Sequence, residues 1–401
     1  MTVLFEDDSG VFYGKPFLGG RFDVPFPMRR EDLARYVRMY ADKGIDYLSW
    51  DTLVNGVASY DSKVAPHVFE GRTDYPPHEN HKIEYFAENT RQLIKNGDDP
   101  LAVVVDTAHA AGMKAIACVR PTLFIPGPDK INSGGGIFYN PRTTEMTDCV
   151  IENLPEIDDW YSGWGSHSQP LDWRHAKVRA MIAGPMREMA FEYDVDGLGI
   201  NFLRSVVQFG APVTQDDLAL MTQFIRDTRA MLDEAAQSRG VDRLMLAVRV
   251  PDRIEACNQY GMDVAAWIRD GLIDFVMPGQ TNDIDFDAPV EPFAKLCQGT
   301  QCQLLPTIGV SYHQDRPMTP QQREHVQATA DASAQQDRIM PHSFEELCEL
   351  AHGWYEKGAA GVSAFNFHHR PPVDVASWDE AVGWFKALGD PAKVASIGQS
   401  V

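Results

Sequence analysis

Short apolar runs alternate with longer amphipathic segments along the whole chain. The runs are too apolar to have one face in water, which is typical of parallel strands that are covered on both sides. The longer segments have apolar residues at helical spacing, as in 30–43, where Leu33, Val37 and Tyr40 share one face. The pattern predicts strands at 3–7, 45–52, 114–120, 195–203, 244–250, 272–278, 303–310 and 361–367.

Turn and cap residues delimit the predicted helices. Gly44 and Gly112 end two of them, while Thr214 with Asp217, and Ser343 with Glu346, have the spacing of N-terminal caps. Gly261 predicts a break, and Gly184-Pro185 predicts a kink. The helices are expected at 30–43, 101–111, 172–192, 214–237, 252–270, 289–297, 343–357 and 378–388.

Eight strands that alternate with helices predict a (β/α)8 TIM barrel. We expect one domain over residues 1–401, with loop insertions at about 54–99 and 121–173 on the C-terminal face. An open doubly wound sheet is the alternative. No GxGxxG or P-loop motif follows a predicted strand, which favours the barrel.

Charge and composition narrow the class of partner. The formal net charge is -21, which argues against a general nucleic-acid binder and against binding to anionic membranes. No run approaches the roughly 20 apolar residues that span a bilayer, and the N-terminus does not read as a signal peptide. The six cysteines form no CxxC pair and are expected to be reduced. We therefore expect a cytoplasmic protein, with the oligomeric state open and a homo-oligomer among the options.

Polar residues gather at the predicted strand ends, and these ends meet at one mouth of a barrel. Side-chain alternation predicts that Asp51 and Asn201 point to the axis, whereas Leu48 and Trp50 point to the helices, and that Arg249 shares a side with Ala247. The structural alternative for the arginines is ion pairing with Asp51 or Asp8. The predicted rim contains Glu6, Asp7, Asp8, Asp51, Arg120, Asn201, Arg204, Arg249, Gln280, Asn282, Asp283, His313, Asn366, His368 and His369.

Aromatic residues are frequent in the predicted strand-to-helix connections. Flat rings with a polar edge suit the apolar face of a sugar, although such rings also pack long loops. Trp50, beside Asp51, is therefore counted among the substrate-binding residues. The others are Tyr60, Tyr139, Trp160, Tyr161, Trp164, Trp173 and Tyr312.

Several local motifs resemble the glycoside-hydrolase-like TIM barrels of the glycosyl hydrolase-like family 10 type. They are Ile45-Asp46-Tyr47-Leu48-Ser49-Trp50, Ser62-Lys63-Val64, Ala108-His109-Ala110-Ala111-Gly112-Met113-Lys114 and Tyr193-Asp194-Val195-Asp196-Gly197-Leu198. The resemblance implies a barrel that acts on a glycan. Related barrels carry two acidic residues in the fourth-strand motif. Here these two places are Gly199 and Asn201, while Arg204 keeps the terminal position.

The main hypothesis is a glycoside hydrolase whose acids come from other strand ends. Hydrolysis of a glycosidic bond uses one protonated carboxyl group and one carboxylate. Asp51 and Asp283 are the predicted pair, with Asp8 or Glu6 in reserve. The substrate is a carbohydrate, and neither an organic cofactor nor a metal is expected. The predicted substrate-binding residues are Trp50, Arg120, Asn201, Arg204, Arg249, His313, Asn366 and His368.

Three alternatives stay open. Three strand-end arginines suit an anionic sugar, and a uronate lyase would use His313 or Tyr312 as base. A barrel that lost its strand-four acids would bind glycans without turnover. A metal-dependent sugar isomerase is the most distant alternative, because no metal-ligand spacing is visible.

Overall fold

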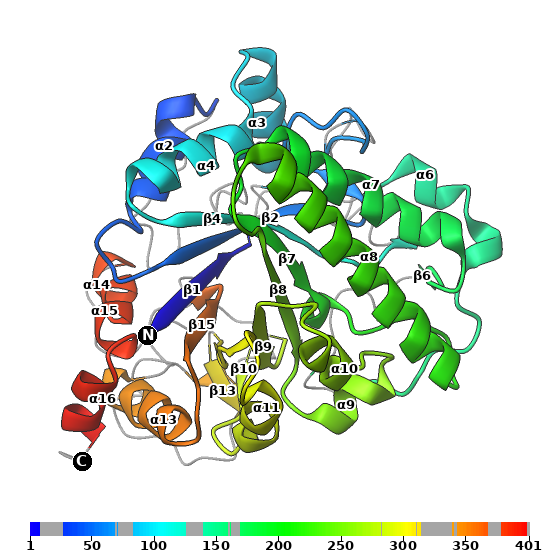
Figure 1. Ribbon diagram of the computed structural model, residues 1–401. Helices are drawn as coiled ribbons and strands as arrows, with labels where there is room; N and C mark the ends of the chain where they lie inside the picture. Colours follow the sequence, from blue (N-terminus) through cyan, green and yellow to red (C-terminus); the bar gives the residue numbers. More distant parts are fainter. Residues whose placement is uncertain are drawn as a thin grey trace.

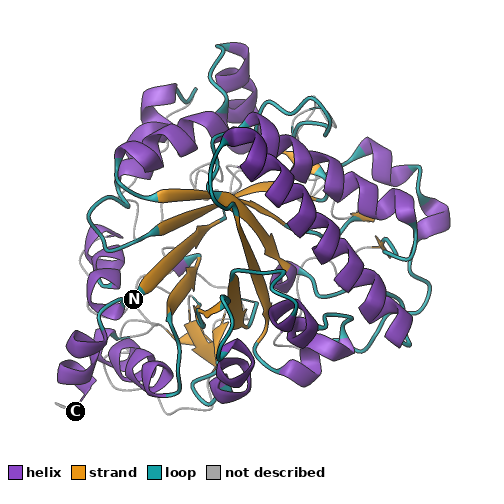
Figure 2. Ribbon diagram, in the orientation of Figure 1, coloured by secondary structure: helices purple, strands orange, loops and turns teal. Residues whose placement is uncertain are grey.

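The computed structural model describes residues 1–8, 27–68, 70, 83–125, 139–158, 161, 169–281, 283–309, 311–313, 339–340, 343–367 and 378–398. Strands occupy the centre of the molecule and helices surround them (Figure 1). Colouring by secondary structure shows the same two layers (Figure 2). The chain therefore has the expected α/β barrel architecture.

The strands of the main sheet are parallel and follow the order β11-β9-β8-β7-β4-β2-β1-β15-β12. Their order matches the chain order that a barrel requires. Their bounds are β1 (Thr2–Asp7), β2 (Tyr47–Val54), β4 (Lys114–Val119), β7 (Gly197–Asn201), β8 (Met245–Pro251), β9 (Phe275–Gly279), β11 (Gln303–Leu304), β12 (Thr307–Ile308) and β15 (Gly361–Phe365).

The two ends of this sheet meet in one stretch of chain. β11 pairs with β9, and β12 pairs with β15, with only Leu305 and Pro306 between the two short strands. The Leu305 N–H donates to Val276 O, while Ser363 N–H donates to Pro306 O. The predicted strand 303–310 is thus interrupted at a proline, which has no N–H to donate. It nevertheless joins both neighbours and closes the ring.

The helices begin and end near the expected positions. Both predicted caps are present, since the Thr214 and Ser343 hydroxyls accept from Asp217 and Glu346 N–H. The predicted break is confirmed, with Gly261 at φ 88° between two short helices. The helices of the outer layer are α2 (Arg30–Arg38), α4 (Pro100–Ala110), α7 (Ala176–Glu192), α8 (Gln215–Arg239), α9 (Ile254–Gln259), α10 (Val264–Arg269), α11 (Val290–Cys297), α13 (Phe344–Glu356), α14 (Trp378–Gly383) and α15 (Phe385–Leu388).

Some elements differ from the prediction. α7 begins four residues later than predicted and is continuous through Pro185, so the predicted kink there stays a prediction, and α16 (Pro391–Gly398) was not predicted. The insertions contain short elements, which are β3 (Val57–Ala58), α3 (Ile83–Lys95), β5 (Phe124–Ile125), α6 (Pro141–Thr144) and β6 (Gln169–Pro170). A small sheet joins β10 (Asp283–Ile284), β13 (Ser311–His313) and β14 (Ile339–Met340). In the described chain, no helix is both long and apolar enough to span a membrane.

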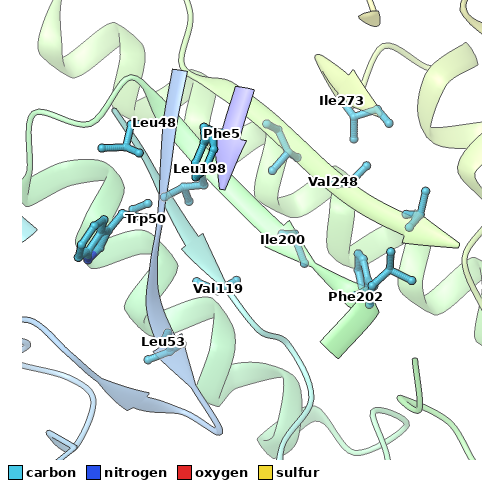
Figure 3. Close-up of a cluster of buried hydrophobic side chains, with 14 of the residues drawn as sticks. Phe5, Leu48, Trp50, Leu53, Val119, Leu198, Ile200, Phe202, Val248 and Ile273 are labelled. Carbon is cyan, nitrogen blue, oxygen red and sulfur yellow. The ribbon is translucent and has the colours of Figure 1, made fainter. Parts of the chain in front are cut away.

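The apolar core has two parts, and strand alternation separates them. Residues such as Phe5, Leu48 and Leu198 point outward and pack against the helices (Figure 3). Residues on the other face of the strands fill the inside of the ring, and they are Leu4, Tyr47, Ile116, Ala247, Phe275, Met277 and Leu305. The predicted register is therefore confirmed.

A repeated aspartate fixes the amino-terminal ends of the strands. Asp46, Asp196 and Asp274 each precede a strand, and each carboxylate accepts a backbone N–H of the preceding neighbour strand at 2.8 Å. Asp196 also lies 2.8 Å from Nε2 of His109. The aspartates at this amino-terminal face therefore align neighbouring strands. In TIM barrels the active site lies at the opposite, carboxyl-terminal face.

Candidate functional site

A layer of polar side chains lies above the apolar interior of the ring, at the carboxyl ends of the strands. Alternation along β1 directs Leu4, Glu6 and Asp8 to the inside. Asp7 points outward, where it accepts hydrogen bonds from the hydroxyls of Tyr36 and Tyr40 on and beside α2. We call the inward group the axial polar layer, and it consists of Glu6, Asp8, Asp51, Cys118, Arg120, Asn201, Arg249 and Asn366, all buried.

Arg120 joins two carboxylates of the axial polar layer. Its Nε lies 2.6 Å from Oδ2 of Asp51, and its Nη2 contacts Oδ1 of Asp8. The three side chains are only 7%, 3% and 5% exposed, so little water screens these contacts. Ion pairing with a guanidinium favours the ionised form of both carboxyl groups. The ion-pair alternative that the sequence left open for Arg120 is therefore confirmed.

Glu6 has a different environment in the same layer. Its Oε1 accepts from Nδ2 of Asn201 and lies 3.7 Å from Sγ of Cys118. Its Oε2 has no hydrogen-bond partner within the described part of the chain. Burial raises the pKa of Glu6, against the lowering effects of Arg249, Asn201 and Arg120. Glu6 is therefore the carboxyl group of this layer that burial biases toward the protonated form.

Arg249 extends the layer toward β9. Its Nη2 donates to Gln280 O at 2.5 Å and to Thr281 O at 3.3 Å, and its guanidinium lies 3.9 Å from the centre of the Phe365 ring. Its Nη1 lies 3.4 Å from Oδ1 of Asn201. These contacts hold the charge of Arg249 over the apolar interior and fix the amide of Asn201.

The fourth-strand positions that are acidic in the resembled family are occupied differently here. A Cβ on Gly199 would lie 3.3 Å from Cβ and Sγ of Cys118 and 3.3 Å from Cγ2 of Ile116. A larger side chain at this position would therefore need its neighbours to shift. Asn201 uses its amide to link Glu6 and Arg249 and to accept from Leu203 N–H at 2.9 Å.

Asn366 closes the layer on the other side of β1. Its backbone is left-handed, with φ 50°, a conformation that asparagine tolerates better than most residues. Its Oδ1 accepts from Asp8 N–H at 3.0 Å, and its Nδ2 donates to Asp8 Oδ2 at 3.0 Å. Asn366 thus orients the carboxylate that contacts Arg120.

The structure brings together five of the predicted substrate-binding or catalytic residues in addition to Asp51. They are Asp8, Arg120, Asn201, Arg249 and Asn366. His368 lies outside the described residues, and so do the side chains of Arg204, Asp283 and His313. The predicted pair of Asp51 and Asp283 consequently stays a prediction.

Trp50 requires a correction. The prediction of a substrate contact is wrong for this side chain, because it points away from the axis into the outer core and packs edge-on against Tyr36 with ring centroids 6.2 Å apart. Other predicted sugar-binding rings also serve packing. Trp173 packs against Phe224, and Tyr60 donates to Glu188. The loop-packing explanation therefore holds for these rings.

Sequence reasoning underrated two acids. Glu6 was held in reserve, although its place two residues before Asp8 already directs it inward. Asp252 was assigned to a helix, but it directly follows β8 (Met245–Pro251), and its Oδ1 accepts from the Tyr161 hydroxyl. Burial raises the pKa of Asp252, and the charge of Asp285 adds to this effect. Its position one residue after a strand was the signal that could have identified it.

The comparisons with known proteins concern the fold. No family model matches this sequence, and no curated protein shows significant sequence similarity to it. The resemblance to the family 10 type therefore stays a prediction. Among solved structures, alpha-L-fucosidase isoenzyme 2 from Paenibacillus thiaminolyticus has 10% identity and a TM-score of 0.50, over 96% of this chain and 48% of that chain.

Two further structures are similar at lower scores. A GH138 enzyme targeting pectin rhamnogalacturonan II has 11% identity and a TM-score of 0.49, over 98% of this chain and 39% of that chain. A GH18 chitinase from Cycas revoluta has 11% identity and a TM-score of 0.43, over 96% and 98%. This chain spans less than half the length of the fucosidase and of the GH138 enzyme. The similarity to the fucosidase supports the barrel fold assigned above.

Proposed function

We propose that this protein is a carbohydrate-active barrel that hydrolyses a glycosidic bond, with Glu6 as proton donor and Asp51 as the ionised carboxylate. One observation carries the proposal. Two carboxyl groups on neighbouring strands of one buried layer have opposite environments, because burial raises the pKa of Glu6 while Arg120 pairs with Asp51. Environments that make the pKa values of two carboxyl groups differ give one site both an acid and a base.

Both carboxyl groups lie near the thiol of Cys118. Its Sγ is 3.7 Å from Oε1 of Glu6, and Asp51 is paired in register with Cys118. After burial, the charges of both acids contribute to a pKa of this thiol well above the ordinary value. Glycoside hydrolysis needs a protonated carboxyl at the leaving oxygen and a carboxylate as nucleophile or base. Glu6 and Asp51 fit these two requirements without a metal or an organic cofactor.

The free-energy cost of burying the charged groups of the axial polar layer supports a functional role for them. Burying carboxylates and guanidinium groups costs several kcal/mol per ion, and an apolar interior of similar shape is often more stable. Buried charged groups of this kind depart from the usual apolar interior, and such departures are expected at functional sites. The fold is also shared with a protein that is named an α-L-fucosidase. We infer a carbohydrate substrate from these points together.

The remaining predicted residues have supporting roles in this proposal. Asp8 shares Arg120 with Asp51 and is the second candidate for the carboxylate role. Asp283 is the alternative acid. Asn201, Arg249 and Asn366 orient the carboxyl groups, and Arg204, His313 and His368 are proposed to contact the sugar. Because Arg120 already pairs with two carboxylates, its role in binding an anionic sugar is not favoured.

Turnover of a panel of aryl glycosides tests the proposal. The panel includes α-L-fucosides, α-D-galactosides and chitooligosaccharides, each with a poor leaving group and, where available, with 2,4-dinitrophenol. Glu6→Gln should lower kcat/KM for the poor leaving group by roughly 10²–10⁴-fold and for dinitrophenol far less, since this leaving group needs no proton. Asp51→Asn should impair both.

Glu31→Gln and Asp216→Asn are matched controls, because they make the same chemical changes at exposed positions on α2 and α8. Unchanged turnover in both Glu6→Gln and Asp51→Asn would refute the assignment. A second function is favoured by Gly199 and Asn201 at the fourth-strand positions, namely a barrel that binds glycans without cleaving them. Binding of a panel glycan by the wild-type chain without turnover would select this second function.

A further inference from the structure

A groove of about 860 Å³ lies at the amino-terminal face of the barrel, opposite the axial polar layer. Its walls come from the end of α11, the start of β11 and the end of α13, and these two helices are neighbours in the outer layer (Figure 1). Cys297, the last residue of α11, and Cys302, which directly precedes β11, both line the groove. Small-molecule sites have volumes of roughly 300–1,000 Å³. A small reagent therefore has room to reach the two thiols.

A tight turn brings the two cysteines together. The Thr300 N–H and hydroxyl both donate to Cys297 O, at 3.0 Å and 2.9 Å, and the same hydroxyl accepts from Cys302 N–H at 3.2 Å. Gly299 gives the turn its left-handed residue, with φ 77°. The chain therefore reverses between the two cysteines, and their thiols are hydrogen-bond partners.

The two thiols differ in exposure and in acidity. All six cysteines are described and carry free thiols, and among them Cys297 is the partly exposed one, whereas Cys302 is buried. The hydrogen bond from Cys302 lowers the pKa of Cys297, against the effect of burial. The same hydrogen bond, together with burial, raises the pKa of Cys302. An accessible thiol of lowered pKa beside a second thiol is typical of redox-sensitive cysteines.

Two other uses of a cysteine pair fit this site less well. Within the described residues, no third His, Cys, Asp or Glu joins the pair in a group that could hold a metal ion, and structural zinc sites have four ligands. Fast catalysis of thiol exchange is not favoured either, because Cys297 ends α11 and the C-terminal end of a helix opposes a negative charge. A slower modification of the protein itself meets neither objection.

We propose that Cys297 and Cys302 form a reversible disulfide, with a low-molecular-weight disulfide such as glutathione disulfide as the oxidant. The Cys297 thiolate attacks one sulfur of the reagent, whose S–S bond breaks to give a mixed disulfide on Cys297 and a free glutathione. Cys302 then loses its proton and attacks Sγ of Cys297, and the second glutathione leaves. Two electrons pass from the protein to the reagent, and the protons of the two cysteines end on the two glutathione thiols. This step is independent of the proposed hydrolysis.

The disulfide cross-links α11 to β11. This short strand pairs with β9 next to the closure of the ring, and its first residue, Gln303, accepts from the hydroxyl of Thr2 in β1 at 2.7 Å. A cross-link restricts the unfolded chain and so favours the folded one. We therefore expect the oxidised protein to have a higher thermal midpoint than the reduced protein.

Peptide mass spectrometry of the folded full chain, after incubation in glutathione redox buffers at neutral pH, tests the proposal. Acid stops the exchange, and the remaining thiols are alkylated in denaturant. Trypsin cleaves after Lys295, so both cysteines leave in one peptide. As the share of glutathione disulfide rises, this peptide should lose two hydrogen atoms and escape alkylation, and dithiothreitol should reverse both changes. The internal controls, which should stay alkylated, are the buried Cys118, Cys149, Cys257 and Cys348.

Two single variants test the role of each thiol, once circular dichroism has shown that they fold. Cys302→Ser removes the second thiol, so Cys297 should retain a glutathione adduct. Cys297→Ser leaves only the buried thiol, which should stay unmodified. Neither variant should gain thermal stability in the oxidising buffer.

Three results would overturn the proposal. One is a wild-type pair that remains a dithiol in the most oxidising buffer. Another is an equal amount of adduct on the two variants. The third is oxidation of the four control cysteines to the same extent as the pair, because unfolding and not the groove would then expose the thiols.

Discussion

Removing the guanidinium of Arg120 should destabilise the protein strongly. Arg120→Met keeps most of the side-chain volume, but it leaves the carboxylates of Asp8 and Asp51 buried without their shared partner. Breaking a buried ion pair by removing one partner costs about 3–5 kcal/mol. The second pair should not double this cost, because a proton on one carboxyl group relieves the repulsion between the two.

The expected loss is therefore about 3–5 kcal/mol of a total stability that for most domains is about 5–15 kcal/mol. Urea unfolding followed by far-ultraviolet circular dichroism at pH 7 measures it as a shift of the midpoint at constant slope. Lowering the pH to 5 should reduce the loss, since protonation then neutralises the uncompensated charge.

Two comparisons make the prediction specific. The triple variant Arg120→Met, Asp8→Asn, Asp51→Asn should recover at least about 2 kcal/mol relative to Arg120→Met alone, because no unpaired charge remains. Arg187→Met should cost no more than about 1 kcal/mol, because its pair with Glu234 is half exposed. A loss below about 1 kcal/mol for Arg120→Met would refute the conclusion that Arg120 compensates two buried carboxylates.

Two more predictions follow from the same structure. The raised pKa of Glu6 means that the folded state binds this proton more tightly than the unfolded state does. The resulting contribution to stability is present at low pH and is lost as the pH rises through the folded pKa. Glu6→Gln should therefore have a higher melting temperature than wild type at pH 8 and a smaller difference at pH 4.5, and equal differences at both pH values would contradict this prediction. Asp274→Asn removes the charge that contacts Arg229 and Arg243 at the amino-terminal face, which should cost about 2 kcal/mol or more and lower the thermal midpoint, yet leave glycoside turnover per folded molecule unchanged.

The sequence by itself determined the secondary structure, the ring of strands and the inward or outward direction of most strand residues. These features depend on local periodicity and on short-range signals such as the Thr214 and Ser343 caps, which a chain carries wherever it folds. The sequence also predicted that Asp8, Asp51 and Arg120 would gather at one mouth. The substrate contact assigned to Trp50 failed because its aromatic character was given more weight than its outward register.

Only the tertiary structure decided which acid has its pKa raised by burial and which acid is paired with an arginine. Glu6 contacts an amide 195 residues away, and Asp8 contacts one 358 residues away. The state of a carboxyl group depends on burial and on the charges within a few ångströms, and neither quantity is encoded in the neighbouring residues.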